Sequence, residues 1–200
     1  MKVLVACEYS GVVRDAFIRA GHDATSCDLL PSDSDFGPHI QGDVLEVLDD
    51  GWDLMIAHPP CTDLAVSGAR HFAAKRADGR QQAALDFVSA LLHAPIPRIA
   101  LENPVSIISS EFRKPEQIIQ PWMFGHPETK KTCLWLKNLP PLVETENVYE
   151  HMLTLPRAQR NRVHFMSPGP ERWKLRSTTY SGIAAAMADQ WGRLEEEAAA

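Results

Sequence analysis

The fold follows from the stretch "KVLVACEYSGVVRDAFIRAGHDATSCDLL" (residues 2–30). Residues 2–7 have the continuous apolar pattern of a buried strand, and residues 23–30 contain a second strand. Between them, residues 10–22 place apolar side chains at helical spacing and end near Gly21, which suits the end of a helix. A strand, a helix and a second strand in succession favour a parallel sheet with a helix packed across it.

The same alternation continues along the chain. Strands are predicted at 52–58, 98–104 and 132–136, helices at 44–51, 80–94 and 181–194, and loops at 31–38 and 61–79. Residues 144–179 are irregular and rich in arginine. The predicted fold class is α/β: a single Rossmann-like domain with a mostly parallel sheet, helices on both faces, and a small irregular basic insertion.

Composition indicates a globular protein of the cytoplasm. The chain has 200 residues, 44% of them hydrophobic, and no apolar run approaches the roughly 20 residues of a membrane span. The first residues predict a core strand, not a signal peptide. The four cysteines lie far apart and the eight histidines are scattered, so we expect reduced thiols and assign no metal.

Charge is distributed unevenly within the net charge of −6. Residues 1–60 contain 3 basic and 11 acidic side chains, whereas residues 61–180 contain 16 basic and 11 acidic ones. Ordinary variation of protein surfaces would account for this, but an acidic first part and a basic second part also suit two ligands of different kinds.

Three of the predicted strands end in chemically unusual residues: "CEYSG" (7–11), "HPPC" (58–61) and "LENP" (101–104). In a parallel α/β sheet, ligands bind beyond the carboxyl ends of the strands, where the strand order reverses. Because all three segments fall at such ends, the sequence predicts one shared site there.

Cys61 is the candidate nucleophile of that site. It follows Pro59-Pro60 directly, where backbone pairing stops, and the next loop contains the basic residues Arg70, Lys75 and Arg76. A thiol attacks as the thiolate, whose formation is favoured by nearby positive charge. The alternative interpretation of a lone cysteine is a small apolar residue that fills a turn.

Glu102 and Asn103 form the second candidate pair. A carboxylate at the end of a core strand loses hydration, so burial is expected to raise its pKa and let it donate a proton near neutral pH. The alternative is a simple strand-ending turn, because Asn-Pro is a common turn dipeptide. A thiolate that adds to carbon 6 of a cytosine, with an acid at ring N3, would activate carbon 5 for alkylation by a sulfonium donor.

These segments resemble the cytosine carbon-5 DNA methyltransferase family, in order along most of the chain. "HPPC" resembles the family's Pro-Cys nucleophile motif, with Gly68 at a matching position, and "ENP" resembles its Glu-Asn-Val. "FGHPETKKTCLWL" (124–136) and "TYSGIAAAMADQWG" (179–192) match two later motifs. The resemblance implies an S-adenosylmethionine-dependent methyltransferase domain that releases S-adenosylhomocysteine.

The resemblance also implies roles for individual residues. The implied catalytic residues are Cys61, Glu102, Asn103 and Lys130. The implied donor-binding residues are Glu8, Tyr9, Ser10, Gly11, Val12, Asp28, Asp43, Pro59 and Ser181. The implied substrate-binding residues are Pro60, Arg70, Lys131, Arg162, Arg172, Trp173 and Arg176. Glu8 and Ser10 stand where the family has glycines, which a donor without phosphates tolerates, and Glu8 is expected to face the cationic methionine end.

The region after residue 136 is smaller than in sequence-specific members of that family. The chain therefore resembles the compact, phage-type form that lacks a full target-recognition region, which implies the cytoplasm of a bacterium or of a phage-infected cell. We expect a catalytic core at 1–110 and 178–194, a reduced substrate-side region at 111–177, and a disordered tail at 195–200. Phosphate contacts position a protein without specifying sequence, so little or short sequence preference is expected, with DNA presenting a flipped cytosine. Two alternatives remain: the same chemistry on a free cytidine or deoxycytidine nucleotide, and a catalytically degenerate relative that only binds nucleic acid.

Overall fold

Strand β1 (Lys2–Ala6) is buried from its second residue onward because it lies inside a seven-stranded sheet. The computed structural model describes residues 1–194, and the sheet order is β3-β2-β1-β4-β5-β7-β6. The other strands are β2 (Asp23–Asp28), β3 (His39–Gln41), β4 (Leu54–Ala57), β5 (Arg98–Pro104), β6 (Gln117–Ile119) and β7 (Thr132–Lys137). Strands β1 to β5 are parallel, and β7 runs antiparallel to both β5 and β6.

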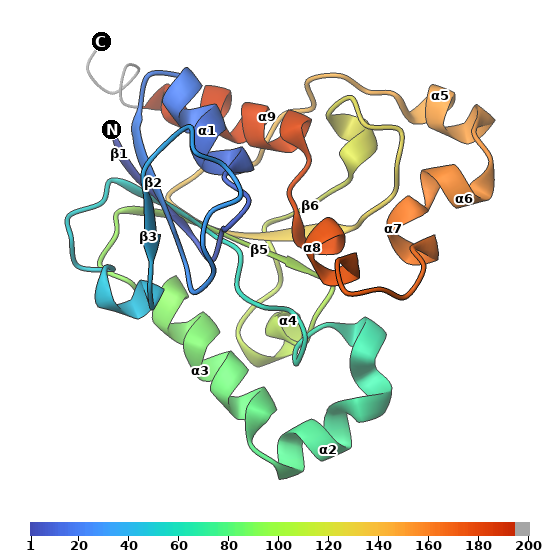
Figure 1. Cartoon of the computed structure of the whole chain (residues 1–200), viewed down its shortest axis with the longest axis horizontal. Helices are drawn as coiled ribbons and strands as arrows, with labels where there is room; N and C mark the ends of the chain where they lie inside the picture. The colour runs from blue at the N-terminus through green and yellow to red at the C-terminus, as the bar shows by residue number, and fades with distance from the viewer. Residues whose placement is uncertain (195–200) are drawn as a thin grey trace.

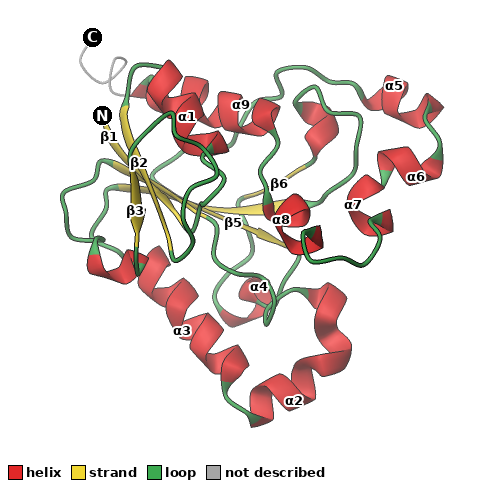
Figure 2. Cartoon of the chain, viewed as in Figure 1, coloured by secondary structure: helices red, strands yellow, loops and turns green. Residues whose placement is uncertain are grey.

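Helices cover both faces of this sheet (Figures 1 and 2). The longer ones are α1 (Val12–Arg19), α3 (Arg80–Leu92) and α9 (Ser181–Gly192). Shorter ones are α2 (Phe72–Ala77), α4 (Ile108–Glu111), α5 (Tyr149–Thr154), α6 (Arg157–Arg160), α7 (Arg162–Phe165) and α8 (Arg172–Ser177). Segments of 3₁₀ helix are η1 (Val44–Glu46), η2 (Val66–His71) and η3 (Pro121–Met123).

Alternation along β1 divides the core into two layers. Val3 and Val5 point to the face covered by α1 and α9, whereas Leu4 and Ala6 point to the face covered by α3. Side chains of a strand alternate between faces, so an apolar residue at every position means that both faces are buried. The α/β Rossmann-like fold predicted from the sequence, with its mostly parallel sheet and helices on both faces, is confirmed.

Helix α9 lies close to the backbone at Phe124 because the residues that face it are small. A Cβ atom on Gly182 would come within 1.9 Å of the carbonyl oxygen of Phe124, so only glycine fits there. Helix α9 also packs along α1, and its Trp191 is fully buried. The small-residue helix predicted at the end of the chain is therefore present, with its small side chains at a close contact.

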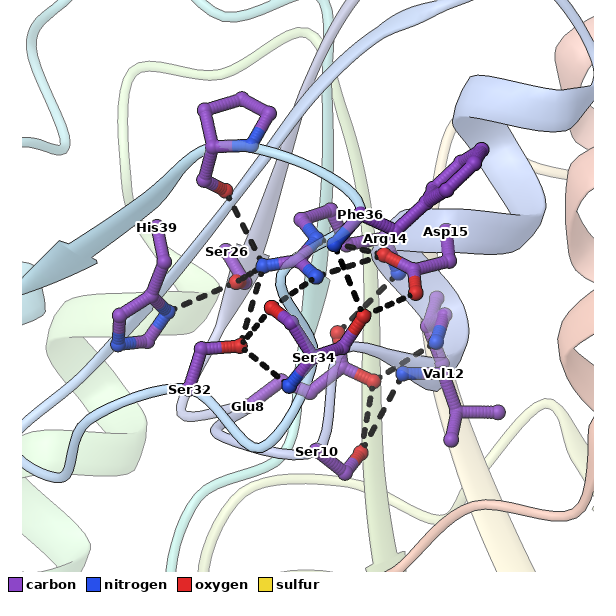
Figure 3. Close-up of polar contacts among 12 residues, drawn as sticks. Glu8, Ser10, Val12, Arg14, Asp15, Ser26, Ser32, Ser34, Phe36 and His39 are labelled. Carbon is purple, nitrogen blue, oxygen red and sulfur yellow. Dashed lines mark hydrogen bonds and ion pairs between the residues drawn. The ribbon is translucent and has the colours of Figure 1, made fainter.

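Arg14 anchors the loop between β2 and β3 from a fully buried position (Figure 3). Its Nε donates to Asp15 Oδ1 at 2.8 Å, and Nη2 donates to the carbonyl oxygen of Ser34 at 3.1 Å. Asp15 in turn accepts the hydroxyl of Ser34 at 2.6 Å. The loop also contacts the segment that follows β1, because the amide of Asp33 donates to the carbonyl oxygen of Tyr9 at 2.8 Å.

The structure differs from the sequence-based prediction in its smallest elements. The helix predicted at 44–51 is the single turn η1, the predicted loop 61–79 contains η2 and α2, and strands β3 and β6 were not predicted. The irregular region 144–179 contains four short helices, α5 to α8. Elements of three to six residues are too short to show a clear periodicity and depend on tertiary contacts. The tail predicted to be disordered lies outside the described residues.

Candidate active site

A cavity of about 1020 Å³ lies at the carboxyl ends of β1, β4 and β5. The strand order reverses between β1 and β4, and a crevice outside such a reversal is the usual ligand site of open α/β sheets. The segments after β1, β4 and β5 that were singled out in the sequence all contribute to its wall. The remaining wall comes from residues within 62–68, 105, 120–131 and 163–179.

Cys61 lies in a tight turn just beyond β4. The amide of His58 makes the last ladder bond of this strand, to the carbonyl oxygen of Ala6 at 2.9 Å, and the two prolines that follow cannot donate. The carbonyl oxygen of Cys61 then accepts the amide of Ala65 at 2.9 Å. Cys61 is an exposed free thiol in the cavity wall.

Glu102 reaches the same cavity from β5, the next strand. Ala57 of β4 pairs with Leu101 of β5, so the residues that follow them, His58 and Glu102, are also neighbours. His58 Nδ1 lies 3.5 Å from Glu102 Oε2, and the side chains are 11% and 17% exposed. The register of two parallel strands therefore brings an imidazole and a carboxylate together.

The protonation of Glu102 differs from the sequence-based prediction. Burial acts to raise the pKa of Glu102, but the hydrogen bond from His58 and the positive charge of Lys130 oppose it, and the net pKa is lowered. A hydrogen bond from Thr132 acts in the same direction. The prediction that burial would raise this pKa is wrong, because the burial comes with a cation and with hydrogen-bond donors.

The pKa of the Cys61 thiol also differs from the prediction that nearby positive charge would favour the thiolate. Desolvation and the negative charge of Glu102 raise its pKa, while Lys130 and Arg176 act to lower it. Two basic residues of the following loop are engaged elsewhere: Lys75 Nζ donates to the carbonyl oxygen of Thr62 and pairs with Asp63 at 3.2 Å, and Arg70 donates to His71. The cations that act on Cys61 therefore come from distant parts of the chain.

Asn103 and Lys130 complete the group of candidate catalytic residues, and both line the cavity. Asn103 Nδ2 donates to the carbonyl oxygen of Pro59 at 2.9 Å, and this residue is 1% exposed. Lys130 is held through its amide, which donates to Gln120 Oε1 at 3.0 Å. Because β7 is antiparallel, the segment that precedes it lies at the same edge as the ends of the parallel strands.

Glu8 serves the start of helix α1 and not an open surface. Its carboxylate accepts the amides of Val13 at 2.7 Å and Arg14 at 3.1 Å, and the residue is 5% exposed. The N-terminus of a helix is where dinucleotide-binding folds hold phosphates, and here a carboxylate of the chain fills that position. Cys7 before it has φ of 58°, a strained conformation of the kind found at ligand sites.

Helix α8 closes one side of the cavity against the loop after β1. The hydroxyl of Tyr9 lies 3.1 Å from the carbonyl oxygen of Lys174 and 3.1 Å from the hydroxyl of Ser177. The ring of Trp173 packs on that of Tyr9 with centroids 5.7 Å apart. Trp173, Arg172 and Arg176 all line the cavity, so a short helix that the sequence did not reveal places three of the predicted substrate residues at the site.

Several predicted donor residues do not line the cavity. Gly11 and Val12 begin α1, Asp28 accepts the amide of Leu30, and Asp43 accepts the amide of Leu45 as the cap of η1. Ser181 begins α9 beside His126. In contrast, Glu8, Tyr9, Ser10 and Pro59 do line it.

Two predicted substrate residues also lie outside the cavity wall. Arg162 donates to Glu128 at 2.9 Å, and the same carboxylate accepts the hydroxyl of Tyr180 at 2.7 Å. Arg70 contacts its neighbour His71 on the surface. Pro60 and Lys131 line the cavity as predicted.

Sequence reasoning did not assign His58 or Thr132, although both contact Glu102. His58 stood in the quoted "HPPC" segment, and its position one residue beyond a parallel strand was the available signal. Thr132 carries no such signal, because its role depends on the pairing of β7 with β5.

Within residues 1–194 there is neither a membrane-spanning helix nor a metal-binding cluster. None of their helices has the length and apolar character needed to cross a bilayer. In the same part of the chain, no three His, Cys, Asp or Glu side chains are grouped so as to hold a metal ion.

Comparison with known proteins finds only a distant likeness. No protein-family model and no curated protein matches the chain. Among solved structures, one similar chain is a candidate DNA modification methyltransferase encoded within a prophage of E. coli, with a TM-score of 0.47 and 16% identity. The match covers 74% of this chain and 54% of the other, so this chain spans about half the length of that protein.

Proposed function

We propose that this protein transfers a methyl group from S-adenosylmethionine to carbon 5 of a cytosine in DNA. The observation that carries the proposal is that Cys61 and Glu102 line one cavity, from the ends of two neighbouring parallel strands. A thiol and a carboxylate that face the same space can engage two sides of one pyrimidine ring.

Each group has a defined task in this reaction. Cys61 Sγ adds to C6 of the base, and Glu102 holds ring N3 and the exocyclic amino group, so that electron density moves to C5. Asn103 fixes the turn of Cys61 through the carbonyl oxygen of Pro59. Lys130 supplies positive charge, which lowers the pKa of Cys61 against desolvation and the charge of Glu102, the larger effects that raise it.

The residues after β1 suit a donor without phosphates. The amides at the start of α1 are already bonded to Glu8, so the position that would cradle a pyrophosphate is filled by a negative charge. S-adenosylmethionine is a cation without phosphates, and when bound it supplies an electrophilic methyl group. A volume of about 1020 Å³ lies at the upper end of small-molecule sites, which suits a donor and a base together.

The opposite wall suits a nucleic acid. Lys130, Lys131, Arg172 and Arg176 line the cavity, and Trp173, which is 51% exposed, stands among them. Cations that bind phosphates position the backbone, and an aromatic ring offers a surface on which a base can stack. A base inside a duplex must leave the stack to enter such a cavity, so the expected substrate is a flipped or unpaired cytosine.

The decisive experiment offers labelled S-adenosylmethionine to DNA, RNA and deoxycytidine nucleotides in parallel and identifies the product base by mass. We expect 5-methylcytosine in DNA, formed by the wild type and by Cys27→Ala, whose cysteine lies outside the cavity. Cys61→Ser should abolish transfer while donor binding, followed by calorimetry, persists. Turnover by that variant at the wild-type rate would contradict the nucleophile assignment.

The two alternatives give different results in the same assay. Transfer to a deoxycytidine nucleotide but not to DNA would favour the nucleotide substrate, and so would a DNA affinity that does not fall steeply with salt. Binding of DNA without any transfer would favour a relative that has lost its catalytic activity.

A further inference from the structure

His58 is the feature of this cavity that the proposed function does not yet use. It lines the cavity one residue beyond β4, and its Nδ1 lies 3.5 Å from Glu102 Oε2. The register makes this a fixed neighbour, because Ala57 and Leu101 are paired immediately before them. Its other ring nitrogen, Nε2, is buried and has no hydrogen-bond partner within residues 1–194. Within residues 1–194, the side-chain hydrogen bond of the His58 ring is therefore the one to Glu102.

His58 is bonded to Glu102 through a ring nitrogen, and four other titratable groups lie around this pair. Lys130 acts on Glu102 as a positive charge from the segment before β7. Cys61, beyond β4, and Cys133, in β7, are thiols whose pKa values are raised, first by desolvation and then by the charge of Glu102. Arg176 of α8 faces the thiol of Cys61. None of these four groups is suited to lend Glu102 a proton.

We propose that His58 is the positioning residue that supplies, through Glu102, the proton placed on ring N3 of the cytosine. The inference rests on the proposed function and adds the origin of the N3 proton. Glu102 touches the base, and His58 acts only through Glu102. The acid of this site is therefore a pair of side chains on neighbouring strands.

The proton transfers balance over one turnover. As the Cys61 Sγ–C6 bond forms, the C5=C6 electron pair moves to C4–C5 and the C4=N3 pair moves onto N3. N3 takes a proton from Glu102, which takes one from His58 Nδ1, leaving a neutral imidazole. After alkylation, the C5 proton passes to water and the C6–S bond breaks, which regenerates the thiolate. The N3 proton then returns through Glu102 to His58.

The test compares His58→Gln with the wild type in single-turnover methyl transfer. Glutamine keeps a donor beside Glu102 but has no proton to release, so we expect a loss of about 10²-fold near neutral pH, the usual scale for one general acid. The defect should shrink as the pH falls from about 7.5 to about 5.5, because Glu102 then takes up a proton of its own. The ratio of variant to wild-type rate at each pH cancels the titration of Cys61.

A second measurement needs no turnover. The ¹³C resonance of the Glu102 carboxyl group should titrate at a higher pH in His58→Gln, because the positive charge of His58, which lowers the pKa of Glu102, is lost while glutamine still donates a hydrogen bond. Should the glutamine variant fail to fold, His58→Asn serves in both measurements. His93→Gln, at an exposed histidine outside the cavity, is the control and should match the wild type.

The outcomes separate this inference from the proposed function. If the wild type methylates cytosine and the rate ratio is close to one or independent of pH, His58 is not the proton source and the proposed function stands. An unchanged Glu102 titration in His58→Gln overturns the inference in the same way. If the wild type methylates no cytosine in any substrate, the proposed function fails, and the assigned role of His58 fails with it.

Discussion

Asn103 joins the two halves of the site, since its Nδ2 donates to the carbonyl oxygen of Pro59 at 2.9 Å. Both residues are buried, and the bond runs from the end of β5 to the turn that carries Cys61. A proline carbonyl in this position has no ladder partner of its own, so the amide satisfies a group that would otherwise be orphaned. This side-chain bond therefore adds to the β4–β5 pairing in holding the turn of Cys61 beside the end of β5.

Replacing Asn103 should therefore affect both stability and rate. Asn103→Ala leaves the Pro59 oxygen buried without a partner and should lower the free energy of unfolding by about 1–3 kcal/mol. Methyl transfer should fall further than the unfolded fraction explains, because the Cys61 turn loses its tether. Urea unfolding and initial rates measure the two effects. Asn147→Ala, at an exposed position, is the control; equal losses in the two variants would contradict this role.

The charges around Cys61 should govern its reactivity even without substrate. Desolvation and the charge of Glu102 raise the thiol pKa, so alkylation by iodoacetamide should still increase as the pH passes 9.0, the ordinary value. Glu102→Gln should speed alkylation at a fixed pH by removing a negative charge, and Lys130→Met should slow it. Peptide mapping by mass spectrometry follows Cys61 alone.

If charge controls the alkylation of Cys61, the two variants must change the alkylation rate in opposite directions. If both variants changed the rate in the same direction, local unfolding and not charge would be responsible. Cys7 provides an internal reference, because burial and nearby acidic side chains raise its pKa well above the ordinary range. It should remain unmodified under conditions that alkylate Cys61.

Arg14 should be among the most destabilising positions to truncate. Arg14→Ala would leave the buried carboxylate of Asp15 without its cation, which typically costs about 3–5 kcal/mol. Arg19→Ala, on the exposed end of the same helix, removes only a contact with the Phe36 ring and should cost about 1 kcal/mol or less. Denaturant unfolding of both variants tests this, and similar losses would show that the buried network is dispensable.

The large elements of the fold and the location of the site could be predicted, because both follow from alternation. Continuous apolar runs separated by helical periodicity determine a parallel sheet, and unusual residues at strand ends then meet at one edge. The position of Cys61 and Glu102 in one cavity wall follows from this logic. Their catalytic roles remain predictions.

What could not be predicted depends on contacts between distant segments. The lowered pKa of Glu102 requires that His58 be its neighbour in register and that Lys130 arrive through an antiparallel strand. Helix α8 is six residues long and is held by Tyr9, which precedes it by more than 160 positions. The roles expected of Asp28 and Asp43 came from order along the chain and remain predictions; their carboxylates accept the amides of Leu30 and Leu45.

His126 should make stability depend on pH. Its Nε2 accepts the amide of Gly182 at 3.0 Å, which requires a neutral ring, and desolvation lowers its pKa below the ordinary 6.5 although Glu128 and Glu146 oppose this. As the pH falls below about 6.5 the unfolded chain takes up the proton first, so the free energy of unfolding should decrease from there downward.

His126→Gln keeps an acceptor for Gly182 but does not titrate, so its unfolding free energy should vary less between about pH 7.5 and about pH 5.5. Urea unfolding across that range provides the measurement. His151→Gln, at an exposed histidine, should retain the wild-type slope. An identical slope in the His126 variant would assign the pH dependence to other groups.

The carboxylate of Glu8 should exclude one class of metabolites from the cavity. Many compounds share an adenosine moiety, and most of them carry polyphosphate chains. A fixed anion that already takes the amides of Val13 and Arg14 repels such chains by charge, whatever the shape of the rest of the molecule. Under the proposed function, selectivity among adenosine compounds would be settled at the first turn of α1, before any contact with the adenine.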